Sequence, residues 1–365
     1  MKIIITVASS RSGHEFFHSL LDGHSQILQF PGPLIANKNF SKIFNLNQIY
    51  KIPEEFIYQY PHFFNSKINT LERHNQLGNK KNKYFKVDEK KFIKSFLTTI
   101  KKKELTKLNI LLSLHIAYEL AKRKKIKNKK IIFINTHSIE NSKKFIKFMK
   151  LKDFKIIHTI RNPMSGLSSP INNWLKYKNG KYFFCKSLFY HFDHVFRAFR
   201  NLLYLRKKIF VIQLEKLHRE NNKVMKDFCK LCKIKFENCL KKSTWHDLEW
   251  WGDQVSKKYL NGVNKKFKTT FRNDLFFNRD INFFEHLAED IIYNYGYSFL
   301  SKSNNKRYFF NILPMKCELI VWKNTLRHGH IFHILSMPYF YLKRIFLINK
   351  FMTKNRYLPY SIGSK

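Results

Sequence analysis

Two short segments of this sequence combine basic side chains with hydroxyl groups in an order suited to holding phosphate. The first is residues 9–13, which follow an apolar run at 3–8 and precede a segment with helical spacing. A strand, a tight loop and a helix start direct backbone N–H groups and the positive end of the helix dipole toward one point, where Arg11 and Ser12 add donors. Gly13 lets the backbone approach a ligand closely. We therefore expect an anion site, though not a Walker loop, because the pattern G-x-x-x-x-G-K-[ST] is absent.

The second segment begins where the apolar run 155–160 ends. Arg161 comes directly after that run, Pro163 follows, and Ser169 lies eight residues beyond Arg161. An arginine at the carboxyl end of a strand, with a serine on the helix that follows, can hold one phosphate by a charge-assisted fork and a hydroxyl. The alternative is a surface arginine that caps the turn before Pro163.

The elements that would position these side chains alternate between strands and helices. Short apolar, β-branched runs predict buried strands at 3–8, 130–135, 155–160 and 209–214. Helical spacing is found at 13–21, 91–100, 105–122, 142–149, 183–205 and 223–232. This alternation predicts an α/β fold, a three-layer sandwich with a mainly parallel central sheet.

We expect residues 1–300 to form this α/β domain and 301–365 to form a helical C-terminal extension. Within the domain, 37–120 is a variable, mostly helical insertion, which we expect above the carboxyl ends of the strands, where it would contact the substrate. The extension is aromatic and basic and is broken by prolines such as Pro338. Such a composition predicts amphipathic helices that either pack on the core or lie at a membrane interface, and not a spanning helix.

The net charge of +44 would suit a polyanion, but composition offers another explanation. Lys, Asn, Ile, Phe and Tyr are all abundant, whereas the chain has 11 Gly and 9 Pro, which is the pattern of a general compositional bias. Nucleic acid is therefore not an expected partner. A strongly positive surface still attracts anionic cofactors, glycans and acidic membranes.

The cysteines and the amino terminus bear on compartment and metal binding. The five cysteines form no paired framework, and Cys229 and Cys232 make a C-x-x-C with no second pair, so no metal is expected. The run 3–8 is shorter than the ~7–15 residues of a signal core. We expect a cytoplasmic protein, with peripheral membrane contact through 301–365 left open.

Five segments, in order, resemble the sulfotransferase family. Residues 10–27, SRSGHEFFHSLLDGHSQI, are similar to its 5'-phosphosulfate loop R-S-G-T-T-L-L and the helix end L-L-D-x-H-P-x-I. Residues 160–169, IRNPMSGLSS, resemble its 3'-phosphate element, R-N/D-P ending in Ser. Further similarity lies in 211–217 (VIQLEKL), 228–236 (FCKLCKIKF) and 250–257 (WWGDQVSK), the last resembling the late loop that closes over the nucleotide. The resemblance covers about 3–34 and 130–258.

This resemblance implies a P-loop-like strand-loop-helix that binds 3'-phosphoadenosine 5'-phosphosulfate without a metal. The sulfuryl group would pass to a hydroxyl of a glycan, lipid or peptide. The implied nucleotide-binding residues are Ser10, Arg11, Ser12, Gly13, His14, Glu15, Phe16, Arg161, Ser169 and Lys257. Arg11 matches the family's charge-stabilising cation.

The sequence departs from the family at His14 and Glu15, where the family has two hydroxyl residues. A carboxylate there would repel the phosphosulfate unless it points away, whereas a cationic His14 could replace a donor. Successive helical residues rotate by roughly 100°, so we expect His14 to line the site and Glu15 to turn from it. Solvent exposure of Glu15 is one such arrangement.

The general base is left open among three residues. His137 follows the predicted strand 130–135 at its carboxyl end and is the first candidate; Glu15 and His14 are the others. The catalytic set is therefore Arg11, His137 and His14. The alternatives are a kinase, for which a Walker lysine is lacking, and a non-catalytic nucleotide-, polyanion- or membrane-binding relative.

Overall fold

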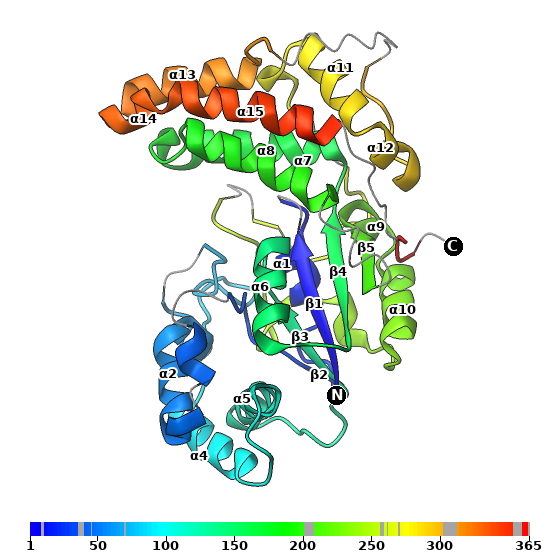
Figure 1. Cartoon of the computed structure of the whole chain (residues 1–365). Coiled ribbons are helices and arrows are strands. Elements are labelled where there is room, and N and C mark those ends of the chain that lie inside the picture. Colours follow the sequence, from blue (N-terminus) through cyan, green and yellow to red (C-terminus); the bar gives the residue numbers. More distant parts are fainter. Residues whose placement is uncertain are drawn as a thin grey trace.

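The central sheet of this protein has five strands, all paired in parallel (Figure 1). The computed structural model describes residues 1–8, 11–35, 40–44, 46–68, 71–200, 208–255, 259–260, 262–268, 271–301, 312–352 and 360–363. In spatial order the strands are β2 (Ile27–Leu28), β3 (Ile131–Asn135), β1 (Lys2–Ala8), β4 (Phe154–Ile160) and β5 (Ile209–Gln213). The four predicted strands are confirmed, and two-residue β2 is too short to show a pattern.

Strand β1 explains why both faces of the sheet are covered. Ile3, Ile5 and Val7 pack into one buried apolar cluster and Ile4 into another on the opposite face. Alternate residues of a strand point to opposite faces, so an unbroken apolar run needs a layer of helices on each side. The three-layer α/β architecture expected from the sequence is confirmed.

One face of the sheet is covered by α1 (His14–Ser19) and α10 (Asn221–Cys232). The other is covered mainly by helices α2 (Ile52–Gln59), α4 (Glu89–Ile100), α5 (Lys107–Ala121), α6 (Ile139–Met149) and α12 (Glu289–Tyr295). The chain caps three of these: Asp88, Thr106 and Ser138 each accept a hydrogen bond from a backbone N–H three residues on. Side-chain oxygens at these positions satisfy donors that a helix start leaves free.

A second helical layer lies above the carboxyl ends of the strands (Figure 1). Its helices are α7 (Pro163–Lys176), α8 (Cys185–Arg200), α11 (Asn278–Leu287), α13 (Lys316–His328), α14 (Ile331–Leu335) and α15 (Met337–Met352). Met315, Val321 and Ile348 of the extension are buried with Leu188 and Phe284 of the preceding domain. The extension therefore completes a core, one of its two expected roles.

The end of the chain returns to the sheet. The backbone N–H of Ile362 donates to the carbonyl of Val211 at 2.8 Å, and the N–H of Val211 donates to the carbonyl of Tyr360 at 2.9 Å. Gln213 donates through Nε2 to the hydroxyl of Ser361 at 3.0 Å. Residues 360–363 thus protect the exposed edge of β5.

The insertion lies partly where the sequence did not place it. Helices α2, α4 and α5 lie below and beside the sheet in Figure 1, because residues such as Phe64 and Phe96 fill the core there. The stretch 71–81 reaches the late loop: Gln254 N–H donates to the Leu71 carbonyl, Gly78 N–H donates to the carbonyl of Glu249, and Lys81 lies over the Trp251 ring. The expectation that the whole insertion lies above the strand ends is wrong.

The remaining elements are short. They are α3 (Pro61–Phe64), α9 (Leu214–Arg219), the hairpin β6 (Thr244–Trp245) and β7 (Leu248–Glu249), and 3-10 turns at Phe40–Phe44, Leu46–Lys51, Tyr177–Gly180, Asn238–Lys241 and Asn273–Leu275.

Candidate active site

The loop after β1 is held close to the ends of β4 and β5. Gly13 has φ 77°, and a Cβ on it would lie 2.4 Å from Leu214 Cδ1, so a side chain would force the loop outward. The Ser12 hydroxyl is 3.0 Å from that of Thr159 on β4. Gly13 is the N-cap of α1 and supplies no side-chain cap. The predicted strand, loop and helix start are present; Ser10 lies outside the described residues.

Arg11 joins this loop to the late loop. Its Nη1 atom is 2.7 Å from Oδ2 of Asp253, and each side chain is about one fifth exposed, at 22% and 21%. The late loop is anchored by the Trp250 indole, which donates to the Glu72 carbonyl at 2.6 Å. The two loops therefore lie together, and an anion bound at Arg11 would compete with Asp253. Lys257, expected in the same loop, is outside the described residues.

Arg161 lies directly after β4 and reaches the Arg11 loop. Its Nη1 donates to the backbone carbonyl of Arg11 at 3.2 Å, while its buried Nε has no hydrogen-bond partner within the described ranges. Burial lowers the pKa of Arg161 to about 10, with Arg11 acting in the same direction and Glu215 opposing it. A buried cationic donor with unused capacity is suited to an anionic ligand.

Asn162 and Glu215 fix the turn that carries Arg161. Asn162 Oδ1 accepts from the N–H groups of Met164 and Ser165 at 3.0 and 3.1 Å, which starts α7. Its own N–H donates to Oε1 of Glu215 at 2.8 Å, and the Tyr297 hydroxyl donates to Oε2 of the same carboxylate at 3.2 Å. The sequence resemblance included Glu215, but nothing in the pattern pointed to Tyr297.

Ser169 is half-buried on α7, and no described contact joins it to Arg161. The neighbouring Ser168 hydroxyl is fully buried and has no partner among the described residues. Phe16 stacks on His218 with ring centroids 4.3 Å apart, and His218 stacks on Phe267 at the same distance. Nucleotide contacts by Ser169 and Phe16 stay predictions.

A carboxylate and two imidazoles form a chain at the carboxyl ends of β1 and β3. His14 Nε2 is 3.1 Å from Glu15 Oε1 and 2.7 Å from His137 Nδ1. Asn135, the last residue of β3, donates through Nδ2 to Glu15 Oε1 at 2.7 Å. Two of the expected catalytic residues, His14 and His137, are therefore in contact. Asn135 was missed, although a polar residue at a strand's carboxyl end is the same signal that marked His137.

The position of Glu15 differs from the expectation. The side chain is 7% exposed and its carboxylate contacts His14, so it does not face solvent, whereas its turning from the phosphosulfate site stays a prediction. Rotation along a helix separates Cβ directions, but longer side chains can still converge. Burial raises the pKa of Glu15, yet the charges and hydrogen bonds of His14 and His18 outweigh it and hold the pKa well below the usual value. The carboxylate thus has two imidazoles beside it, and the alternative of a solvent-facing Glu15 is wrong.

His137 presents the outer end of this chain. Its side chain is exposed, while its backbone φ of 64° is in the left-handed region. The residue reaches the surface, but protein packed around its imidazole, together with the adjacent His14, lowers the pKa of His137 to about 3. A neutral imidazole at physiological pH can accept a proton.

His14, Glu15 and His137 are residue types that bind divalent metals, and their possible ligand atoms lie within 4.8 Å of one another. Two imidazole nitrogens on one tetrahedral zinc would be about 3.4 Å apart, given ~2.1 Å bonds. The 2.7 Å between His14 and His137 is instead a hydrogen-bond distance. The expectation that no metal is needed stays a prediction.

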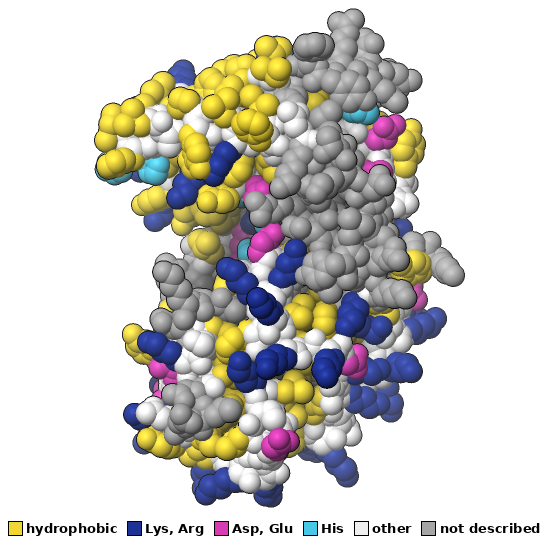
Figure 2. Space-filling model, viewed as in Figure 1, with side chains coloured by type: hydrophobic (Ala, Val, Ile, Leu, Met, Phe, Trp, Pro, Cys, Tyr) yellow, Lys and Arg dark blue, Asp and Glu magenta, His cyan; other side chains and the backbone are white. Residues whose placement is uncertain are grey.

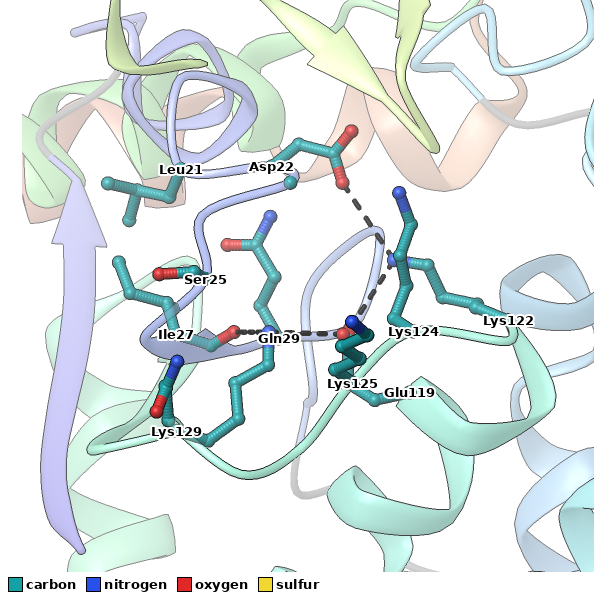
Figure 3. Close-up of a pocket in the computed structure, with 12 residues that line it drawn as sticks. Leu21, Asp22, Ser25, Ile27, Gln29, Glu119, Lys122, Lys124, Lys125 and Lys129 are labelled. Carbon is teal, nitrogen blue, oxygen red and sulfur yellow. Dashed lines mark hydrogen bonds and ion pairs between the residues drawn. The ribbon is translucent and has the colours of Figure 1, made fainter. Parts of the chain in front are cut away.

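A pocket of about 240 Å³ lies elsewhere, at the opposite edge of the sheet (Figure 3). Asp22, Glu119, Lys122 and Lys129 line it, and none of the expected site residues does. Lys122 and Lys129 form ion pairs with Glu119. We place the candidate site at the carboxyl ends of the strands, where Arg11, Arg161 and the His14–His137 pair lie.

Comparisons with known proteins are sparse. No family model matches the chain. No curated protein matches it either. Solved structures similar to it include the sulfotransferase domain of the Synechococcus PCC 7002 olefin synthase, at 14% identity and TM-score 0.37, with 73% of this chain and 85% of that chain covered. The sulfotransferase domain from the curacin biosynthetic pathway is 14% identical with TM-score 0.38, covering 81% of this chain and 98% of that one. At these values the likeness establishes no function.

Proposed function

We propose that this protein transfers a sulfuryl group from 3'-phosphoadenosine 5'-phosphosulfate to a hydroxyl group. The observation that carries the proposal is the meeting of Arg11 and Arg161 at the carboxyl ends of adjacent strands, where the Arg161 guanidinium contacts the Arg11 backbone at 3.2 Å. A nucleotide with anionic groups at both 5' and 3' positions requires two neighbouring cationic sites. The unused Nε donor of Arg161 fits the second of these groups.

The proposed reaction forms one bond to sulfur and breaks another. The acceptor oxygen attacks the sulfur, the bond from sulfur to the 5'-phosphate oxygen breaks, and 3',5'-adenosine bisphosphate leaves. Negative charge grows on that phosphate, and Arg11 lies in the loop where a cation would stabilise it. Ser12 is fixed on β4 through Thr159 and keeps the loop in place.

His137 would take the proton from the acceptor hydroxyl. The imidazolium that forms contacts His14, which contacts the buried Glu15 carboxylate. Burial and His14 disfavour the positive charge on His137, and the Glu15 carboxylate beyond His14 would partly offset that cost as the proton is transferred. Asn135 holds the carboxylate at 2.7 Å and acts as a positioning residue.

A non-catalytic nucleotide-binding relative is the second candidate. The observation that favours it is the buried carboxylate of Glu15 at the helix start, where a hydroxyl donor would suit a phosphosulfate better. Such a protein would bind the nucleotide without consuming it.

Labelled donor separates these candidates. The protein would be incubated with donor carrying radioactive sulfur and with glycan, lipid and tyrosine-peptide acceptors, and both labelled product and released 3',5'-adenosine bisphosphate would be measured. We expect transfer to one acceptor class, lost in Arg11→Ala and strongly reduced in His137→Gln, and unchanged in Tyr58→Phe on the exposed surface of α2. Binding of the nucleotide without turnover on any acceptor supports the non-catalytic candidate, and absence of binding contradicts both.

A further inference from the structure

A stripe of large apolar side chains runs along the outside of α14 and α15. Its members are spaced three or four residues apart and are all more than half exposed: Phe332 (80%), Leu335 (69%), Tyr339 (53%), Leu342 (53%) and Phe346 (71%). This spacing places them on one face of a helix. Figure 2 shows hydrophobic side chains gathered over α13 to α15, whereas lysine and arginine are prominent over the lower half of the molecule.

The opposite face of α15 fixes this orientation. Phe340 and Ile348 are buried in the core cluster shared with α8. Arg344 is also buried and donates to Glu318 of α13 through Nε at 3.0 Å and through Nη2 at 2.9 Å. Because these contacts hold the inner face, the stripe cannot turn inward without breaking a buried ion pair.

Charge decides which partner suits the stripe. Residues 312–352 contain one acidic residue, Glu318, and it is paired with Arg344. Every other formal charge in this range is positive, including Lys323, Arg327 and Lys343. A second copy of this chain would bring the same cations to the contact, whereas anionic lipid headgroups would complement them.

We propose that α14 and α15 form an interfacial membrane-binding surface that inserts its apolar stripe into an anionic lipid bilayer. Aromatic and aliphatic side chains would enter the boundary between headgroups and acyl chains, and the flanking cations would contact phosphate and carboxylate headgroups. Helix α15 packs on α8 through its inner face and leaves the stripe on the outside, where it suits a fluid, extended surface.

The helices lie on the bilayer and do not span it. Ile331–Asn349 is long and apolar enough to cross a membrane by length and composition, which the sequence reading had not expected, and 11% of that window is buried in the structure. Spanning would place Lys343 and Arg344 in the hydrocarbon and would separate Arg344 from Glu318, both of which are costly. An interfacial position keeps Lys343 near water and preserves the ion pair between Arg344 and Glu318.

Vesicle co-sedimentation of the full chain tests this proposal. We expect binding to phosphatidylcholine vesicles that contain phosphatidylserine, with at least tenfold weaker binding to pure phosphatidylcholine. The double variant Phe332→Ser with Phe346→Ser should weaken binding on the order of a hundredfold, because two large apolar side chains no longer leave water. Both positions are exposed, so the thermal unfolding midpoint should not change.

The matched control removes two equally exposed aromatic residues elsewhere. Tyr58 and Tyr293 are 79% and 69% exposed, and Tyr58→Ser with Tyr293→Ser should bind vesicles as the unmodified protein does. Failure of the unmodified protein to bind anionic vesicles overturns the proposal, as does equal binding by the stripe variant. Dimerisation through the stripe would also overturn the proposal. In that case the unmodified protein would not bind vesicles, and sedimentation velocity would show it as a dimer and the stripe variant as a monomer. Retention on vesicles after an alkaline carbonate wash contradicts the interfacial arrangement.

Discussion

The central sheet has charged side chains buried near both ends of its parallel strands, which we call its amino-terminal and carboxyl-terminal edges. The two edges differ in whether these side chains are paired with one another. At the amino-terminal edge, Glu119 lies 3.4 Å from Lys122 and 3.1 Å from Lys129, and Lys129 also donates to the carbonyl of Ile27 at 2.6 Å (Figure 3). Burial alone would raise the pKa of Glu119, but the two lysines lower the pKa by more than burial raises it, so the carboxylate stays ionised. These charged groups therefore pair mainly with one another.

At the carboxyl-terminal edge, hydrogen-bonding capacity is left over. Arg161 Nε is buried without a hydrogen-bond partner in the described part of the chain, and the imidazole of His137 is exposed. Gln29 is an exception at the other edge, since its amide lacks partners there. We infer from this difference that unused donors at the ends of strands point to the candidate site better than the volume of a pocket does.

The largest expected effect is on stability, at the amino-terminal edge. Glu119→Gln should lower the free energy of unfolding by about 3–5 kcal/mol, because it leaves Lys122 and Lys129 buried without their common partner. Denaturant unfolding measures this, and nucleotide affinity of the folded protein should stay unchanged. Glu289→Gln, at a 40% exposed side chain, is the control and should cost little. A loss under 1 kcal/mol for Glu119→Gln would remove the distinction between the edges.

The next effect is on turnover, at the carboxyl-terminal edge. Arg11→Ala should lower turnover by about 10²–10³-fold, the usual loss of a transition-state donor, with a smaller loss of donor affinity. Arg123→Ala, an exposed arginine at the other edge, should leave both unchanged. A loss of donor affinity with turnover at saturating donor unchanged would show that Arg11 only binds the donor.

The pH dependence should differ between catalysis and folding. The pKa of His137 is lowered to about 3, so it stays neutral and able to accept a proton throughout pH 5–8. His74 and His158 are buried, and their pKa values are also lowered to about 3. Below about pH 6.5 the unfolded chain therefore binds protons that the folded chain does not, and the free energy of unfolding decreases as the pH is lowered. Per folded molecule, kcat/KM should be flat across pH 5–8. A kinetic pKa near 6.5 that vanishes in His137→Gln would contradict this.

The smallest expected effect is that of metal removal. Because His14 and His137 lie at hydrogen-bond distance, dialysis against a chelator should leave turnover unchanged, and added Zn²⁺ should not raise it. Metal analysis of the purified protein gives an independent measure. Loss of turnover on chelation and its recovery with a divalent ion would assign His14, Glu15 and His137 as ligands.

The strands and the loop could be predicted from the sequence because their signals are local. The run at β1 is apolar on both faces, and Gly13 follows it where the backbone turns. The direction of the Glu15 side chain could not be predicted, because it depends on Asn135, 120 residues away. Likewise Asp253 meets Arg11 across 242 residues, and only the folded chain shows the pair.

The central claim is that the carboxyl-terminal edge binds a nucleotide carrying both 5' and 3' phosphates. Calorimetric titration of the unmodified protein and of Arg161→Ala with 3',5'-adenosine bisphosphate and with 5'-AMP tests it directly. We predict a preference for the bisphosphate, of which Arg161→Ala loses about 1.5–3 kcal/mol, the value of a charged hydrogen bond. Equal affinity of the unmodified protein for the two nucleotides would contradict the claim.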